Sequence, residues 1–116
     1  MPTSLNLLVL RSENPKALAE VWAHFGFSFS PESHGAGPIH YVAKMEDFVL
    51  EIYPRDSSQA TTIGTRIGLR IENVEALLAG LPEGLTLLKQ YQTTNEKRAV
   101  VSDFEGHKIE LTSGNG

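Results

Sequence analysis

The sequence has no cysteine among its 116 residues. Disulfide bonds, thiolate chemistry and zinc or iron–sulfur sites built on cysteine are therefore excluded. Long hydrophobic runs are missing as well. The apolar stretch near the start, Leu7–Leu10 preceded by Leu5, is too short for a signal-peptide core or a membrane span. We expect a cytoplasmic protein without a membrane segment.

An excess of basic charge is also missing. The formal net charge is −4, from 10 basic and 14 acidic residues, and the two signs are scattered. A surface that binds nucleic acid would need a basic stripe, so we expect no nucleic-acid partner. With 41% hydrophobic residues, a chain of this length can bury a core of its own. We expect a single domain, 1–116.

The first half of the sequence contains a strand, a helix and three more strands. A short apolar strand is predicted over 5–11. Asn14 followed by Pro15 predicts a helix start, because Asn accepts a hydrogen bond from a free N–H and proline lacks one. One apolar face follows at helical spacing: Leu18, Val21, Trp22 and Phe25. Gly26 ends the helix. Further strands are predicted over 27–30, 39–45 and 48–53, the last two joined by a tight turn at 46–47.

The second half repeats this order after a polar linker, 55–65. Strands are predicted over 66–71, 85–88, 98–102 and 107–112, with a helix capped by Asn73 after the first of them. An offset of 59 residues relates Asn14 to Asn73 and also Glu51 to Glu110. The repeat predicts an α+β protein of two tandem βαβββ units. The alternative is a coincidental α+β meander.

Several motifs of this repeat resemble those of the glyoxalase/bleomycin-resistance/dioxygenase (vicinal oxygen chelate) superfamily. They are Asn14 with Val21-Trp22 and Phe25-Gly26-Phe27, Leu50–Pro54, Asp103–Leu111 and His34–Tyr41. The resemblance spans about 5–112. It implies that the units, about 5–54 and 66–112, form a curved mixed sheet with a central cup and with helices on the convex side. It also implies a small-molecule ligand in that cup and pairing into a homodimer.

Alternation along the strands places candidate site residues in the cup. Leu50, Ile52, Ile109 and Leu111 should pack against the helices, so Glu51 and Glu110 should face the cup. His40 shares that face if the turn at 46–47 has two residues, and faces the helices if it has three.

The resemblance implies metal ligands at Glu51 and Glu110, and two more on the opening strands. Those two positions hold Leu7 and Arg66, and neither can bind a metal ion. We therefore predict that the guanidinium of Arg66 takes the place of the ion and pairs with one or both carboxylates. No cofactor is then required.

The predicted roles follow from this arrangement. Glu51 and Glu110 are candidate general bases, and Arg66, His40, Arg11 and Arg70 are candidate substrate-binding residues; Arg11 and Arg70 would lie near the cup edge and could bind an anionic group. One alternative is a purely structural ion-pair cluster. Another is a divalent metal (Zn, Ni, Mn or Fe) held by Glu51, Glu110 and a histidine such as His40.

Two main functions remain open. The first is a lyase, isomerase or dioxygenase that acts on a small oxygenated molecule. The second is a metal-free protein that sequesters a small molecule or drug, as bleomycin-resistance proteins do. A third is a dimer-building module without a ligand. The sequence does not decide whether the protein is an enzyme.

Overall fold

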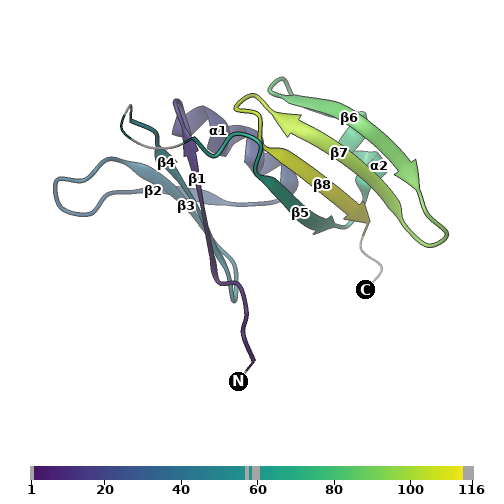
Figure 1. Cartoon of the computed structure of the whole chain (residues 1–116), viewed down its shortest axis with the longest axis horizontal. Helices are drawn as coiled ribbons and strands as arrows, with labels where there is room; N and C mark the ends of the chain where they lie inside the picture. The colour runs from purple at the N-terminus through teal and green to yellow at the C-terminus, as the bar shows by residue number, and fades with distance from the viewer. Residues whose placement is uncertain (1, 57, 59–60, 114–116) are drawn as a thin grey trace. The chain divides into compact units, whose positions relative to one another are not determined.

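The chain forms two compact units, Met1–Thr62 and Ile63–Gly116. The computed structural model describes residues 2–56, 58 and 61–113. Each unit has one helix and one four-stranded sheet, in the chain order strand, helix, strand, strand, strand. Figure 1 shows the first unit in purple to teal and the second in teal through green to yellow. The predicted α+β class and the two tandem βαβββ units are confirmed.

The first unit is built around a mixed sheet. Its elements are β1 Leu7–Ser12, α1 Pro15–Trp22, the 3-10 turn η1 Ala23–Phe25, β2 Phe29–Glu32, β3 His40–Lys44 and β4 Val49–Pro54. The strand order is β1-β4-β3-β2. The pair β1–β4 is parallel and the other two pairs are antiparallel. The first and last strands of the unit therefore lie side by side (Figure 1).

The second unit repeats this topology. Its elements are β5 Arg66–Ile71, α2 Val74–Ala79, β6 Leu85–Gln92, β7 Lys97–Asp103 and β8 Lys108–Ser113. The order β5-β8-β7-β6 again sets a parallel pair, β5–β8, beside two antiparallel pairs. The opening and closing strands of the two units start and end at positions 59 residues apart, as the sequence predicted.

Both helices begin at the predicted caps. The side chain of Asn14 accepts a hydrogen bond from the backbone N–H of Ala17 at 3.2 Å, and that of Asn73 accepts one from Ala76 at 2.9 Å. Each bond satisfies one donor that the helix itself leaves free. After α1, Gly26 adopts a φ of 106°, a conformation that favours glycine.

Side chains alternate along β4 and β8, the last strand of each unit, so each sheet has two different faces. Leu50, Ile52, Ile109 and Leu111 are at most 1% exposed, on the face that packs against the helix of their own unit. Trp22 of α1 is fully buried. Because side chains alternate along a strand, Glu51 and Glu110 lie on the opposite faces of these sheets. The helix therefore covers one face of each sheet, and the polar candidates lie on the other.

Two predicted strands were wrong in their extent. The predicted strand 27–30 lies at Phe29–Glu32 and continues through Pro31, and the predicted strand 85–88 runs on to Gln92. Both are edge strands, which pair with one neighbour only and tolerate proline and exposed polar side chains. The opening strand also starts two residues later than predicted, at Leu7. No helix in the described part of the chain is long and apolar enough to cross a membrane.

Candidate functional site

The register of β3 and β4 decides the orientation of His40. Val42 lies opposite Glu51, and Met45 closes the connecting turn by donating its backbone N–H to the carbonyl oxygen of Phe48 at 2.8 Å. This is the two-residue turn, so His40 lies on the Glu51 face of the sheet. The choice that the sequence left open is thereby settled.

Arg11, Tyr53 and His40 form a stacked row across β1, β4 and β3. The rings of His40 and Tyr53 are 4.0 Å apart and inclined by only 7°. The guanidinium carbon of Arg11 lies 5.1 Å from the centre of the Tyr53 ring, a cation–π distance. Sequence reasoning gave Tyr53 no role, although its position two residues after Glu51 placed it on the same face. The row brings a guanidinium, a phenol and an imidazole together.

His40 is the most constrained member of this row. Its side chain is fully buried, and its Nδ1 donates to the carbonyl oxygen of Pro38 at 3.3 Å. A carbonyl oxygen only accepts, so Nδ1 carries the proton and neutral His40 has its lone pair on Nε2. This Nε2 is buried and has no hydrogen-bond partner within the described residues. The Oε2 atom of Glu51 lies 4.0 Å away, too far for a direct hydrogen bond.

The loop before β3 brings a second histidine to His40. The rings of His34 and His40 are 5.2 Å apart. The loop turns at His34, whose carbonyl oxygen accepts from the N–H of Gly37 at 2.9 Å, and Gly35 has a φ of 58°. A Cβ atom on Gly37 would lie only 2.9 Å from that same oxygen. Both glycines thus permit the turn that places His34, a residue that the sequence marked only as a histidine in a glycine-rich loop.

Glu32 completes a group of three possible metal ligands. It lies opposite His40 in the β2–β3 pair. One ligand atom from each of Glu32, His34 and His40 lies within 4.8 Å of the other two. Glu32 also pairs with Lys44 at 3.5 Å, on the surface. Sequence reasoning missed this group because it predicted that β2 ended before Glu32.

Arg66 and Glu110 form an ion pair in the second unit. The Nε atom of Arg66 donates to Oε2 of Glu110 at 2.5 Å. This hydrogen bond and the positive charge of Arg66 lower the pKa of Glu110. Glu51 belongs to the first unit, so its meeting with Glu110 and Arg66 in one cup stays a prediction.

Arg70 belongs to a separate ion-pair cluster of the second unit. The Nη1 atom of Arg70 lies 3.5 Å from the carboxylate of Glu96, and Arg98 lies 3.3 Å from the same carboxylate. Hydrogen bonds that the guanidinium of Arg98 donates to Tyr91 and Glu96 raise the pKa of Arg98. Arg98 stands two residues before Val100, the partner of Glu110, as His40 stands two residues before the partner of Glu51. The second unit therefore has a cation where the first has an imidazole.

His107 has a structural role. It is fully buried, and its Nδ1 lies 2.8 Å from the buried carboxylate of Asp103, which also accepts from the backbone N–H of His107. This pair fixes the turn between β7 and β8. The geometry thus gives the imidazole of His107 a partner within its own turn.

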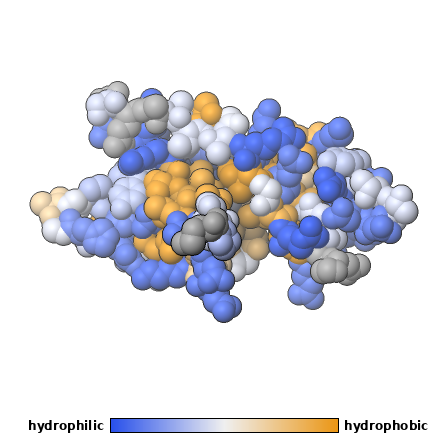
Figure 2. All heavy atoms as spheres, turned by 60° about the horizontal axis from the view of Figure 1, so that its bottom comes forward, coloured by the Kyte–Doolittle hydropathy of each residue, from blue (hydrophilic) through white to orange (hydrophobic). Residues whose placement is uncertain are grey.

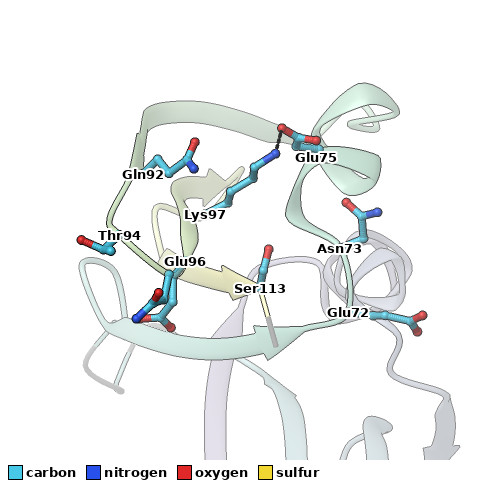
Figure 3. Close-up of a pocket in the computed structure, with 9 residues that line it drawn as sticks. Glu72, Asn73, Glu75, Gln92, Thr94, Glu96, Lys97 and Ser113 are labelled. Carbon is cyan, nitrogen blue, oxygen red and sulfur yellow. Dashed lines mark hydrogen bonds and ion pairs between the residues drawn. The ribbon is translucent and has the colours of Figure 1, made fainter. Parts of the chain in front are cut away.

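A polar hollow of about 340 Å³ lies at the end of the second sheet. Figure 3 shows Glu75 and Lys97 pointing toward each other across it, joined by an ion pair. Its Glu96 is already paired with Arg70 and Arg98. None of the predicted site residues lines this hollow. Its paired charges are typical of a solvated surface rather than of a binding site.

No family model matches the sequence, and no curated protein matches it significantly. Solved structures do match. One is TnmS3, an antibiotic binding protein from Streptomyces sp. CB03234, with a TM-score of 0.75, 18% identity and 98% of each chain covered. Another is a glyoxalase/bleomycin resistance protein/dioxygenase family enzyme from Burkholderia phytofirmans PsJN, with a TM-score of 0.73, 16% identity and 96% of this chain and 98% of that chain covered.

This chain has the glyoxalase/bleomycin-resistance/dioxygenase fold. The oxidase ChaP-H2 also shares the fold, with a TM-score of 0.77, 17% identity and 98% of this chain and 95% of that chain covered. The resemblance seen in the sequence motifs is thus confirmed at the level of the fold. At identities below one fifth, the likeness carries no activity with it.

Proposed function

We propose that this protein of the glyoxalase/bleomycin-resistance/dioxygenase fold binds a small oxygenated organic molecule, with Arg11, Tyr53 and Glu51 as its main contacts. The stacked row is the observation that supports this most. Its guanidinium and phenol lie on the sheet face away from α1, which also carries Glu51, whose side chain is 20% exposed. Arginine and tyrosine donate to ligand oxygens, and Glu51 accepts from a ligand hydroxyl.

The second unit contributes further proposed contacts. Arg66, Arg70 and Glu110 lie on the corresponding face of its sheet, with Arg66 and Glu110 already paired. The fold shared with an antibiotic binding protein supports capture of a small molecule as the function. We therefore propose a sequestering protein that does not require a metal in order to bind its ligand.

Binding is tested by calorimetry with catechols, vicinal diketones and glycopeptide antibiotics, in the presence of EDTA. A ligand that binds wild type should bind Arg11→Met at least about tenfold more weakly and Tyr53→Phe about fivefold more weakly. The reason is that a hydrogen bond to a charged group contributes about 1.5–3 kcal/mol and a neutral one about 1 kcal/mol. Lys16→Met and Tyr91→Phe are the matched controls, one exposed on α1 and one in the second unit. Equal affinity in the Arg11 and Tyr53 variants would contradict the proposed contacts.

A catalytic version of the same proposal is a lyase, isomerase or dioxygenase in which Glu51 is the general base. Arg66 lowers the pKa of Glu110 below the usual value of a glutamate, which makes Glu110 a poor candidate for the general base. The fold shared with an oxidase supports this version. Turnover of a bound compound, followed by mass spectrometry, should then fall far more in Glu51→Gln than in Glu110→Gln. If a compound binds without any turnover, the catalytic version is wrong and only the sequestering function remains.

We also propose that the chain pairs as a homodimer. The first unit exposes large apolar side chains, with Leu5 at 72%, Leu7 at 47% and Ile39 at 60%. Figure 2 shows hydrophobic side chains gathered on the face that it presents. Light scattering should give twice the 12.7 kDa of one chain, and Leu7→Lys should shift the mass toward the monomer. At about 100 µM, a dimer with a Kd of about 1 µM is almost fully formed, so a monomeric wild type at that concentration would exclude the proposed dimer.

A further inference from the structure

We infer that the first unit binds a divalent transition-metal ion through Glu32, His34 and His40. This site differs from the metal site considered from the sequence, which needed Glu51, Glu110 and a histidine. It lies wholly in one unit, at the end of the β2–β3 pair and in the loop between these strands. Its ligands are therefore independent of the placement of the second unit.

Three observations bring the ligands to one point. Glu32 and His40 are cross-strand neighbours, whose side chains project together on one face. The turn closed by Gly37 carries His34 to a ring distance of 5.2 Å from His40. The three ligand atoms lie within 4.8 Å of one another. Ligands around zinc, at about 2.0–2.2 Å from the ion, are separated by roughly 3.3 Å, so the ligand atoms need to approach one another by at most about 1.5 Å.

Glu32 and His34 can make this movement, because their side chains are not fully buried. Glu32 is 32% exposed at its side chain and His34 is exposed, whereas His40 is held in the sheet between Tyr53 and Pro38. The competing contact of Glu32 is its ion pair with Lys44, whose side chain is 70% exposed. Such surface pairs contribute little to stability, so an ion can displace it.

The buried Nε2 atom of His40 points independently to a ligand. A buried polar atom without a partner is uncommon in a folded protein and calls for an explanation. The Nδ1 proton is committed to the carbonyl oxygen of Pro38, which leaves a lone pair on Nε2. Histidines that bind metals usually donate their other N–H to a backbone carbonyl in this way. His40 is thus prepared as a metal ligand.

Glu51 adds a fourth group near His40. Its Oε2 atom lies 4.0 Å from Nε2, so two acceptors face each other across a gap without a proton between them. A cation in that gap attracts both. Two imidazoles with one or two carboxylates suit zinc, iron, cobalt or nickel, whereas magnesium and calcium prefer oxygen ligands alone. We assign the site to a divalent first-row transition ion, with zinc as the probe.

The inference does not rest on the proposed binding of an organic molecule. The test therefore titrates zinc alone into chelator-treated protein by calorimetry, with metal content measured after dialysis. Wild type should bind one ion per chain. His34→Ala and Glu32→Gln should bind at least about tenfold more weakly, since even residues that only orient a ligand usually cost 10–100-fold. His24→Ala removes an exposed histidine of η1 and should bind like wild type.

A second readout separates coordination from a change in folding. Ring-nitrogen NMR signals of His34 and His40 should shift with zinc while those of His24 and His107 stay in place, and circular dichroism should show that each variant is folded. Zinc binding that survives in both His34→Ala and Glu32→Gln overturns the site. If Glu110→Gln loses zinc binding while His34→Ala retains it, the ion lies elsewhere and the proposed site is wrong. A zinc Kd of wild type no lower than about 0.1 mM also refutes the proposed site. Organic ligands are titrated separately in EDTA, so failure of one proposal leaves the other standing.

Discussion

Zinc should raise the thermal stability of this protein through His34 and His40. An ion that binds only the folded state stabilises it by RT ln(1 + [L]/Kd), which is about 2.7 kcal/mol at a hundredfold excess over Kd. The unfolding entropy of a globular protein is about 2.1 cal/mol/K per residue near 60 °C. For cooperative unfolding of all 116 residues, the midpoint should therefore rise by about 11 °C.

The same calculation has a second outcome, because all the proposed ligands lie in the first unit. If the 62 residues of that unit unfold separately, the same free energy is divided by about half the entropy. The midpoint of its transition should then rise by about 20 °C, while the transition of the second unit stays where it was. The size of the shift thus reports how cooperatively the two units unfold.

Differential scanning calorimetry measures both quantities on chelator-treated protein, with and without zinc. At the zinc concentration used for wild type, a tenfold weaker site in His34→Ala should lose about 1.3 kcal/mol, roughly half of the shift. His24→Ala should keep the full shift. The reasoning is wrong if His34→Ala and wild type respond equally to zinc, or if EDTA does not reverse the shift.

Three further perturbations test the fold and its charges. Arg66 lowers the folded-state pKa of Glu110, so the stability that the pair provides is present above the unfolded-state pKa of glutamate and is lost as pH falls through the lower folded value. Arg66→Gln should therefore weaken the dependence of urea stability on pH in the acid range. An unchanged pH profile would count against the pair. Asn14→Ala and Asn73→Ala should each lose about 1 kcal/mol in urea unfolding, and no loss would mean that the cap bonds are not formed in solution. Trp22→Ala should lose about 3–5 kcal/mol by the same measurement, since the ring is fully buried, and a loss below about 1 kcal/mol would contradict that burial.

Sequence periodicity predicted the parts of the fold that depend on local chemistry. The caps at Asn14 and Asn73 follow from one side chain and a nearby N–H, so they could be predicted without tertiary information. The face on which Glu51 lies followed from alternation along a buried strand. The expectation that Arg66 pairs with Glu110 came from the family resemblance, and the two residues form an ion pair between the adjacent strands β5 and β8.

The remaining features depend on contacts that local pattern does not record. The edge strand β6 carries polar residues beyond Leu88 and is held by pairing with β7, so its length could not be predicted from hydrophobicity. The group of Glu32, His34 and His40 depends on where β2 ends and on the conformation of the loop after it. Loop conformation is set by turn geometry, here by the positive φ of Gly35, rather than by periodicity.

The two units share a backbone plan but differ in the chemistry of corresponding side chains. Where the first unit has His40 beside Tyr53, the second has Arg98 opposite Thr112. An imidazole can coordinate a metal or exchange a proton near neutral pH, whereas a guanidinium remains charged and only donates. We therefore expect metal coordination in the first unit, while Arg98 supplies fixed positive charge at the corresponding place in the second unit. If this difference decides metal binding, Arg98→His should not create a second zinc site, because the described residues of the second unit contain no counterpart of the His34 turn. Two bound ions per chain in that variant would disprove the role of the loop.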